Sequence, residues 1–253
     1  REHIVDSARV HYAFIDAGGT SANVVHPSAS LYYFIRAKKL SEARDIFERV
    51  NKIAKGAAMM TETEVEIVFD SAAINYIPNK VLTTAMHENM SNYGSLDLTE
   101  EELEYERRYY DSLSKSEKES LYYRTKSFFP GLEEEELRKL TESPVLEKTV
   151  PLFFTDQAMG STDVGDVSWV VPTAIVNVSC EPQGTPPHSW QWVANGKSSV
   201  AHKGVLAGGK IIADTAYDIL TNPELVEKAK AEHQKNLGGK KYESGIPADV
   251  LPR

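Results

Sequence analysis

The chain has 253 residues and a mass of 28.2 kDa, with 41% apolar and 26% charged residues. This composition is ordinary for a globular protein and excludes a chain that is disordered throughout. A formal net charge of -9 argues against nucleic acid and anionic membrane surfaces as partners. No apolar run reaches the roughly 18 residues of a membrane span, and the lone Cys180 cannot form an internal disulfide. Because no signal-peptide pattern is visible, the cytoplasm is the expected compartment.

The first part of the chain predicts a small layer of strands and one helix. Residues 9–15 and 29–37 are rich in β-branched and aromatic types and predict two strands, with a turn signal at 16–19. Apolar residues at helical spacing predict a helix over 42–58, and strict alternation predicts a third strand over 64–69. The order β-β-α-β is that of an α+β sandwich without its first strand and helix.

Helices dominate the next part of the chain. Asn79 opens a predicted helix over 80–92. The segment 99–142 carries 13 acidic and 8 basic residues, with tyrosines and leucines at helical spacing. It therefore predicts two or three surface helices with a break at Pro130-Gly131. The acidic runs are typical of a solvated helix face, which makes a metal site or a site for a cationic partner here unexpected.

The apolar content rises again after residue 150. Residues 173–179 predict a buried strand, and 182–198 are rich in Pro, Gly, Ser and Thr and predict a loop. Residues 200–221 carry small and aliphatic side chains on most faces, which predicts a buried helix. Pro223 then begins a polar helix over 223–236.

One cluster that could carry chemistry is Gly160-Ser161-Thr162-Asp163-Val164-Gly165-Asp166, which leads into an apolar run that we expect to be a strand. Such a turn places carboxylates and hydroxyls at a strand end, where α/β proteins form their sites. The alternative is a structural turn in which Ser161 or Asp163 binds backbone N–H groups.

A second cluster is Gly184-Thr185-Pro186-Pro187-His188-Ser189-Trp190. A histidine in a loop stiffened by two prolines suits a metal ligand, since the imidazole must be oriented and neutral. The alternative is a loop histidine that only bonds a carbonyl. The sequence contains neither H-E-x-x-H nor paired cysteines, so it carries no self-contained zinc motif.

A third stretch, together with these two clusters, resembles one known protein family. Residues 17–27, Ala-Gly-Gly-Thr-Ser-Ala-Asn-Val-Val-His-Pro, followed by Tyr33-Phe34-Ile35-Arg36, resemble the lid (dimerisation) domain of the co-catalytic dinuclear metallopeptidases and amidohydrolases. This family includes aminoacylase, carboxypeptidase G and succinyl-diaminopimelate desuccinylase. Residues 160–166 resemble its G-S-x-D turn. The runs G-S-T-D-V-G-D-V-S-W and G-T-P-x-H-S-W are most similar to the p-aminobenzoyl-glutamate hydrolase branch of the family.

The resemblance implies roles for individual residues. Asn23 aligns with a catalytic lid asparagine that reaches across the dimer to the substrate. Arg36 aligns with a lid arginine that binds the substrate carboxylate, for which a bidentate fork is well suited. The turn Ser161-Thr162-Asp163 aligns with residues that line the substrate pocket, and His188 with a metal-ligand histidine. His202 follows the site in a helix and has either a function there or a role in packing and in support of a ligand.

The resemblance also implies an α/β fold in two parts. A partial lid domain of the α+β sandwich type covers 1–76. The C-terminal part of a phosphorylase/hydrolase-like α/β catalytic domain covers 77–253, with a charged helical insertion at about 95–150. The family's other metal ligands, its Glu-Glu pair and a lid histidine have no counterpart in this sequence. The chain therefore resembles the C-terminal half of such an enzyme.

The implied reaction is hydrolysis of the amide bond of an N-acyl amino acid, such as p-aminobenzoyl-glutamate, or of a small dipeptide. Two divalent ions, zinc or manganese, activate the attacking water in such enzymes. The implied partners are this substrate and a second copy of the chain bound through the lid. A different, second subunit is a further option. One histidine is too few ligands for tight zinc binding, so we expect the chain alone to be inactive. The alternative is a non-catalytic dimerisation or partner-binding module, because a β-β-α-β layer exposes an edge strand and an apolar face.

Overall fold

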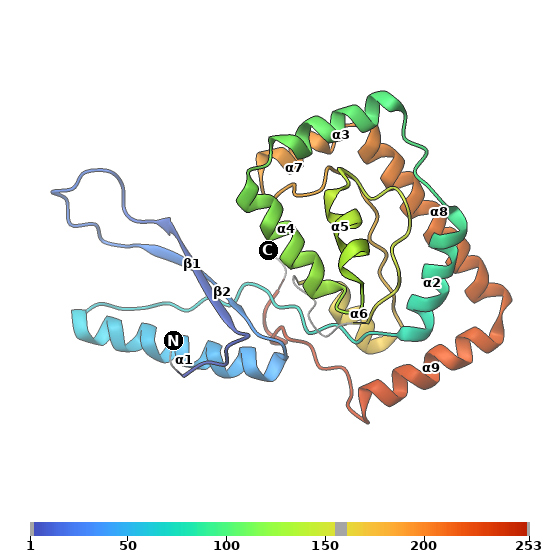
Figure 1. The fold of residues 1–253 in the computed structure, drawn as a ribbon. Helices are drawn as coiled ribbons and strands as arrows, with labels where there is room; N and C mark the ends of the chain where they lie inside the picture. The colour runs from blue at the N-terminus through green and yellow to red at the C-terminus, as the bar shows by residue number, and fades with distance from the viewer. Residues whose placement is uncertain (1–2, 155–160, 252–253) are drawn as a thin grey trace. The chain divides into compact units, whose positions relative to one another are not determined.

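The computed structural model describes residues 3–154 and 161–251, which form helices and a small sheet (Figure 1). The chain divides into two compact units. Unit 1 is drawn from residues 1–76, 161–167 and 241–253, and unit 2 from 77–160 and 168–240. This mixture of helix and strand is compatible with the predicted α/β class. Across the described ranges, no helix is long and apolar enough to cross a membrane.

Unit 1 is built on a β-hairpin and one long helix. The strands β1 (Arg9–Asp16) and β2 (Ser30–Arg36) pair antiparallel, with Arg9 opposite Arg36. The helix α1 (Leu40–Thr61) contacts β2. These three elements confirm the first two strands and the first helix predicted from the sequence. The buried apolar side chains of unit 1, among the described residues, are Ala8, Ile46 and Ile74.

The third predicted strand is wrong. Residues 63–76 belong to no β-ladder in the described part of the chain, although Phe69 packs edge-on against Phe47 with ring centroids 5.6 Å apart. A strand needs a neighbour with which it exchanges backbone hydrogen bonds, and the hairpin strands pair with each other. The alternating side chains at 64–69 therefore remain largely exposed.

Three helices frame unit 2. The helix α2 (Lys80–Tyr93) packs against α8 (Ser199–Thr221) and α9 (Pro223–Leu237), and α8 packs against α9 (Figure 1). Each begins at a side-chain cap, because Asn79, Ser198 and Asn222 accept hydrogen bonds from backbone N–H groups in the first turns. All three helices confirm the predicted spans within a few residues.

The charged segment of unit 2 forms the three helices α3 (Glu100–Ser112), α4 (Lys115–Phe128) and α5 (Glu134–Glu142), as predicted. Thr99 and Ser114 form reciprocal capping boxes with glutamates three residues later, which fixes the starts of α3 and α4. Most of the buried side chains of unit 2, among the described residues, are apolar. These side chains form its core, which includes Leu82, Leu96, Tyr110, Leu121, Leu137, Val145, Val200, Ala207, Ile211 and Ala229.

Two segments of unit 2 are less buried than the sequence predicted. Residues 173–179, predicted as a buried strand, form no ladder in the described structure, and Ile175 is exposed. The helix α8, predicted to be buried, is covered on one face only. In addition, the predicted loop 182–198 contains the short helix α7 (Trp190–Asn195), which begins where Ser189 accepts the N–H of Trp192. Apolar side chains of residues 173–179 and of α8, such as Ile175 and Leu220, are therefore exposed in unit 2.

Candidate functional site

Two sequence motifs that are far apart in the chain meet in unit 1. The guanidinium Nη2 of Arg36, at the end of β2, donates a hydrogen bond of 3.3 Å to Ser161 Oγ. Arg36 is half-buried and lies over the ring of Phe34, with 5.8 Å between Cζ and the ring centroid. Such a guanidinium keeps its charge and presents a planar fork of donors. The structure thus brings together two of the residues predicted to bind substrate.

The rest of the 160–166 cluster begins a helix. The N–H of Val164 donates to Thr162 Oγ1 at 3.2 Å, and the N–H of Asp166 donates to the carbonyl oxygen of Asp163 at 3.1 Å. The apolar run that follows is the helix α6 (Val164–Val170), so the strand expected there is wrong. The side chain of Asp163 is exposed, and Gly160 lies outside the described residues. The turn therefore caps a helix and also presents Ser161 to Arg36.

Asp166 holds this turn in place, a role that sequence reasoning missed. Its Oδ2 accepts the N–H of Ile74 at 3.2 Å, and its Oδ1 accepts the hydroxyl of Tyr242 at 2.9 Å, which raises the pKa of Tyr242. A Cβ on Gly165 would lie 2.1 Å from the carbonyl oxygen of Ile74. These contacts tie together three segments of unit 1, at residues 74, 165–166 and 242.

Asn23 lies far from Arg36 within one copy of the chain. It is exposed in the loop that joins β1 to β2, where the N–H of Val24 donates to the carbonyl of Ser21 at 3.2 Å. This loop forms the tip of the hairpin (Figure 1). Arg36 ends the strand β2, whose seven residues span roughly 20 Å. Asn23 and Arg36 therefore occupy opposite ends of the hairpin, and one copy does not bring them to one site.

The hairpin loop has a fixed conformation near its start. Asp16 Oδ1 accepts the N–H of Gly18 at 2.7 Å, and Gly18 has a φ of 86°, which favours glycine. A Cβ on Gly18 would lie 2.2 Å from Cγ of His26. His26, whose role the sequence left open, thus packs on the turn.

His188 sits in an anchored loop of unit 2. Gln183 binds the loop to the end of α5, since its Nε2 donates to the carbonyl oxygens of Leu140 at 2.5 Å and of Ser143 at 2.7 Å. His188 itself is exposed and has a φ of 58°, a left-handed conformation that is uncommon outside glycine. Uncommon backbone conformations of this kind cluster at functional sites. An exposed imidazole on a fixed backbone suits a ligand.

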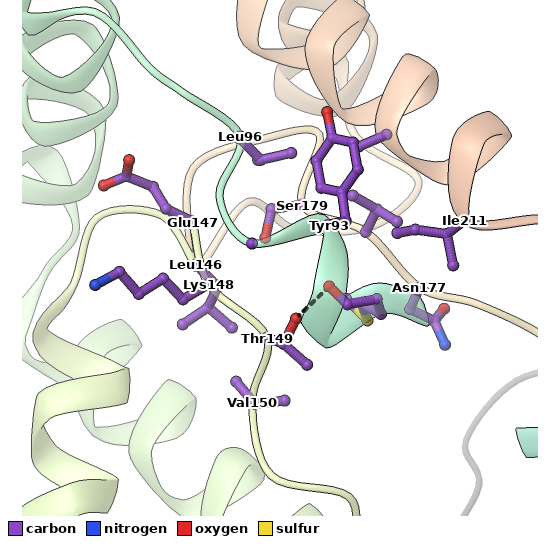
Figure 2. Close-up of a pocket in the computed structure, with 14 residues that line it drawn as sticks. Tyr93, Leu96, Leu146, Glu147, Lys148, Thr149, Val150, Asn177, Ser179 and Ile211 are labelled. Carbon is purple, nitrogen blue, oxygen red and sulfur yellow. Dashed lines mark hydrogen bonds between the residues drawn. The ribbon is translucent and has the colours of Figure 1, made fainter. Parts of the chain in front are cut away.

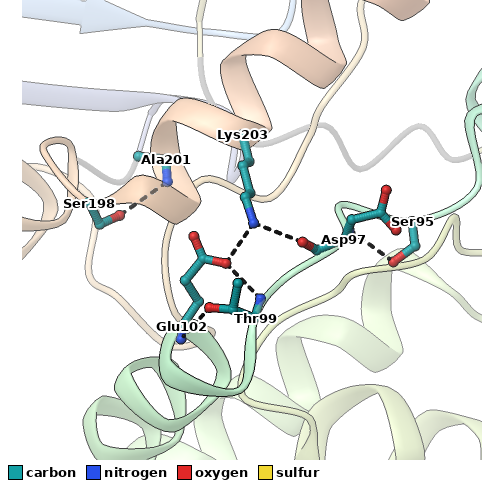
Figure 3. Close-up of polar contacts among 7 residues, drawn as sticks. All are labelled: Ser95, Asp97, Thr99, Glu102, Ser198, Ala201 and Lys203. Atoms are coloured by element: carbon teal, nitrogen blue, oxygen red, sulfur yellow. Dashed lines mark hydrogen bonds and ion pairs between the residues drawn. The ribbon is translucent and has the colours of Figure 1, made fainter.

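His202 is also exposed, on α8, and no side-chain hydrogen bond to it is found within residues 3–154 and 161–251. Its neighbour Lys203 takes part in a polar network instead (Figure 3). Lys203 Nζ donates to Glu102 Oε2 at 2.7 Å and to the carbonyl oxygen of Asp97 at 2.7 Å. The ammonium of Lys203 is the first cause that lowers the pKa of Glu102 to about 2. The role predicted for His202 remains untested by these contacts.

The pKa of Glu106, one helical turn after Glu102, is shifted in the opposite direction. Its side chain is fully buried and neither carboxylate oxygen has a hydrogen-bond partner among the described residues. Burial is the main cause that raises the pKa of Glu106 to about 7, with the charges of Glu181 and Glu102 adding to it. Burial likewise raises the pKa of the Cys180 thiol, which argues against a nucleophilic role for it.

The Glu102→Gln and Glu106→Gln variants should therefore change stability in opposite directions. The raised pKa of Glu106 contributes stability below pH 4.5 that is lost as the pH rises through about 7. Removing this charge should stabilise the chain at pH 8 by up to about 3 kcal/mol. The lowered pKa of Glu102 contributes stability above pH 4.5 that is lost as the pH falls towards about 2. Glu102→Gln should cost about 1 kcal/mol at pH 8, after allowance for solvent screening.

Urea unfolding of the three proteins at pH 5 and pH 8 measures both effects. The Glu106→Gln variant should gain most at pH 8 and little at pH 5. A loss of stability in that variant at pH 8 would show that the Glu106 carboxylate is compensated in the folded protein.

A small cavity of about 80 Å³ lies between the end of α2, residues 146–150, residues 177–179 and α8 (Figure 2). Its wall includes Tyr93, Leu96 and Ile211, and Thr149 Oγ1 donates to the carbonyl oxygen of Met90 at 2.9 Å beside it. Ligand pockets usually have at least about 300 Å³. None of the predicted site residues lines this cavity, so we do not assign the substrate to it.

The described residues by themselves do not fit a dinuclear metal centre. Among them, no three His, Cys, Asp or Glu side chains gather in a group that could hold a metal ion. His188 offers one imidazole, whereas zinc sites take three or four protein ligands. A metal at His188 would therefore need donors from elsewhere.

Comparison with known proteins supplies the class. The chain is 37% identical to a p-aminobenzoyl-glutamate hydrolase subunit of Escherichia coli (strain K12) over 254 residues, which cover 99% of this chain and 52% of that protein. It is 25% identical to the Xaa-Arg dipeptidase of Mus musculus over 245 residues, 94% of this chain and 43% of that protein. It is 22% identical to the Xaa-Arg dipeptidase of Homo sapiens over 247 residues, 97% of this chain and 44% of that protein. No protein-family model matches.

These relatives are named as a hydrolase and as dipeptidases, which confirms the resemblance to amidohydrolases and peptidases. Within that class, the predicted likeness to the p-aminobenzoyl-glutamate hydrolase branch is also confirmed, at 37% identity. The chain spans about half the length of the curated relatives that it matches.

Proposed function

We propose that this chain is the C-terminal half of a metal-dependent amidohydrolase. The complete enzyme would cleave the amide bond of an N-acyl amino acid such as p-aminobenzoyl-glutamate, or of a small dipeptide. The names of the relatives support this reaction class. The observation that carries it is the hydrogen bond between Arg36 and Ser161, which are 125 positions apart in the sequence.

Arg36 and Ser161 are proposed to bind a carboxylate of the substrate. The guanidinium supplies a fixed fork of N–H donors, and Ser161 adds a hydroxyl donor beside it. Because both side chains are held by unit 1, the carboxylate would be oriented with little loss of side-chain entropy. Thr162 and Asp163 would line the same pocket from the start of α6.

Asn23 is proposed to act on the substrate of a second copy of the chain. Its exposed place at the far end of the hairpin from Arg36 supports such a role, since an amide N–H there is presented outward. Directed at the scissile carbonyl, this N–H would donate to the oxyanion that forms during hydrolysis. The enzyme would then be a homodimer through the lid, with sites that need both copies.

His188 is proposed to be one ligand of a pair of zinc or manganese ions. Its anchored loop and outward imidazole support this role. When bound, the ions would supply an activated water and polarise the carbonyl. The remaining ligands would come from the half of the enzyme that this chain does not cover.

The test is p-aminobenzoyl-glutamate hydrolysis by the chain together with its missing half, read alongside metal content. Turnover that depends on bound zinc or manganese supports the proposal. A complete, metal-loaded protein that cleaves neither p-aminobenzoyl-glutamate nor Xaa-Arg dipeptides would overturn it.

A non-catalytic module is the second candidate, and one observation favours it. The hairpin exposes aromatic side chains on both faces, with Tyr12 and Phe14 on one face and Tyr32 and Phe34 on the other. A hairpin of this kind favours association whether or not the complete protein is an enzyme. The hydrolysis assay separates the two candidates, because a module would associate without turnover.

A further inference from the structure

Glu106 is a buried carboxyl group without a hydrogen-bond partner. Its side chain is fully buried, and neither Oε1 nor Oε2 has a partner among the described residues. It lies on the inner face of α3, one helical turn from Glu102 and from Tyr110, which is also buried. The hydroxyls of Tyr105 and Tyr110 donate to other acceptors, each at 2.7 Å. Because a buried and unpaired charge is costly, this environment favours the protonated form of Glu106.

The His188 loop, residues 181–189, packs against the end of α3. A Cβ on Gly184 would lie 2.4 Å from Cδ1 of Leu113, the residue that follows the helix. The N–H of Gln183 donates to the carbonyl oxygen of Pro144 at 2.7 Å, which ties the loop to the segment after α5. This hydrogen bond and the contact at Gly184 therefore report whether the loop is packed on unit 2.

The charged groups around Glu106 do not offset a charge on it. Glu181, half-buried at the start of the His188 loop, is the second cause after burial that raises the pKa of Glu106. Glu102 adds a further negative charge from α3, while Lys203 of α8 is held at Glu102 by an ion pair of 2.7 Å. The Cys180 thiol, just before the loop, stays neutral because burial and the charge of Glu181 raise its pKa. An ionised Glu106 would therefore lie unpaired near a second, half-buried acid of the loop.

We propose that Glu106 is a positioning residue for His188: its protonated carboxyl lets the His188 loop pack on α3, and its carboxylate loosens that packing. Movement of the loop away from α3 would let water reach an ionised Glu106 and would separate it from Glu181. The pKa of Glu106 is about 7 in the packed state and would return to the ordinary 4.5 once exposed. The packed loop is therefore fully favoured below pH 4.5, and this advantage is lost as the pH rises through about 7. The inference rests on the proposed function only for the ligand role of His188.

The test is hydrogen–deuterium exchange of the 253-residue chain at pH 5 and pH 8, corrected for the intrinsic exchange rate. Protection of the loop amides, that of Gln183 included, should fall about tenfold or more from pH 5 to pH 8. In Glu106→Gln, which keeps the shape of the side chain but not its charge, protection should stay high at both pH values. Glu181→Gln should reduce the fall, because it removes the acid of the loop that opposes Glu106.

Glu104→Gln, at an exposed acid of the same helix, is the matched control and should keep the original pH dependence within about twofold. In the complete enzyme, the ratio of kcat/KM in Glu106→Gln to that in the original should rise with pH. Equal loop protection at both pH values in the original chain, the same fall in Glu106→Gln, or a kcat/KM ratio independent of pH would each overturn the inference. Loop protection that changes as expected, in a complete protein that hydrolyses nothing, would uphold the action of Glu106 on the loop and refute the proposed function.

Discussion

Replacing His188 with asparagine in the complete enzyme is expected to lower kcat/KM for p-aminobenzoyl-glutamate by about 10³-fold or more and to reduce the bound metal. Asparagine is the suitable replacement because His188 has a φ of 58°, a left-handed conformation that asparagine tolerates better than alanine. The loop should therefore keep its structure while it loses the imidazole. Steady-state kinetics and elemental mass spectrometry on the same sample measure both effects.

The matched control is His11→Asn, at an exposed histidine of the strand β1. It should leave the metal content and kcat/KM within about twofold of the original enzyme. Full metal occupancy and normal turnover in the His188→Asn enzyme would refute the ligand role. Equal losses in both variants would indicate a general effect on folding instead.

Replacing Arg36 should raise KM for a substrate with free carboxylates by roughly 10²-fold, with a smaller effect on kcat. Arg36→Lys keeps the charge but loses the planar fork, so it should fall between the original enzyme and Arg36→Ala. An analogue whose carboxylates are converted to amides should bind the original enzyme poorly. The Arg36 variants should lower its affinity little further, because the charge-assisted contact is already lost.

Arg9, directly opposite Arg36 in the hairpin, supplies the control. Its guanidinium donates to the backbone carbonyls of Asp6 and Ala8 and should not contact substrate. Arg9→Ala should therefore leave KM unchanged, apart from any loss of stability. If Arg36→Ala raises KM equally for the free and the amidated substrate, Arg36 does not recognise the carboxylate.

Local signals in the sequence predicted most of the helices. The pattern of apolar side chains was sufficient for α2, α3, α4, α8 and α9, with start signals at Asn79 and Pro223, because a helix satisfies its own backbone hydrogen bonds. The two strands β1 and β2 were also predicted, and they are neighbours in the chain that pair with each other. The strands predicted over 64–69 and 173–179 failed, because a strand needs a partner that the described part of this chain does not place beside them.

The sequence proposed residues for the candidate site but not how they are arranged. The motif resemblance named Arg36 and Ser161, yet only the fold shows that they are in hydrogen-bonding contact. No sequence signal pointed to Asp166 as the anchor of the turn, because its partners Ile74 and Tyr242 are distant in the sequence. The buried state of Glu106 was hidden as well, since the surrounding acidic run is typical of a solvated surface.

The most direct test of the central claim is a single paired measurement. Metal content and p-aminobenzoyl-glutamate hydrolysis are determined for the 253-residue chain, first alone and then after addition of the complementary half. A half-enzyme should hold less than about 0.1 metal ion per chain and show no turnover alone, and both should appear after the addition. About two metal ions per chain with turnover by the chain alone would contradict the account, because its own residues would then form the complete centre.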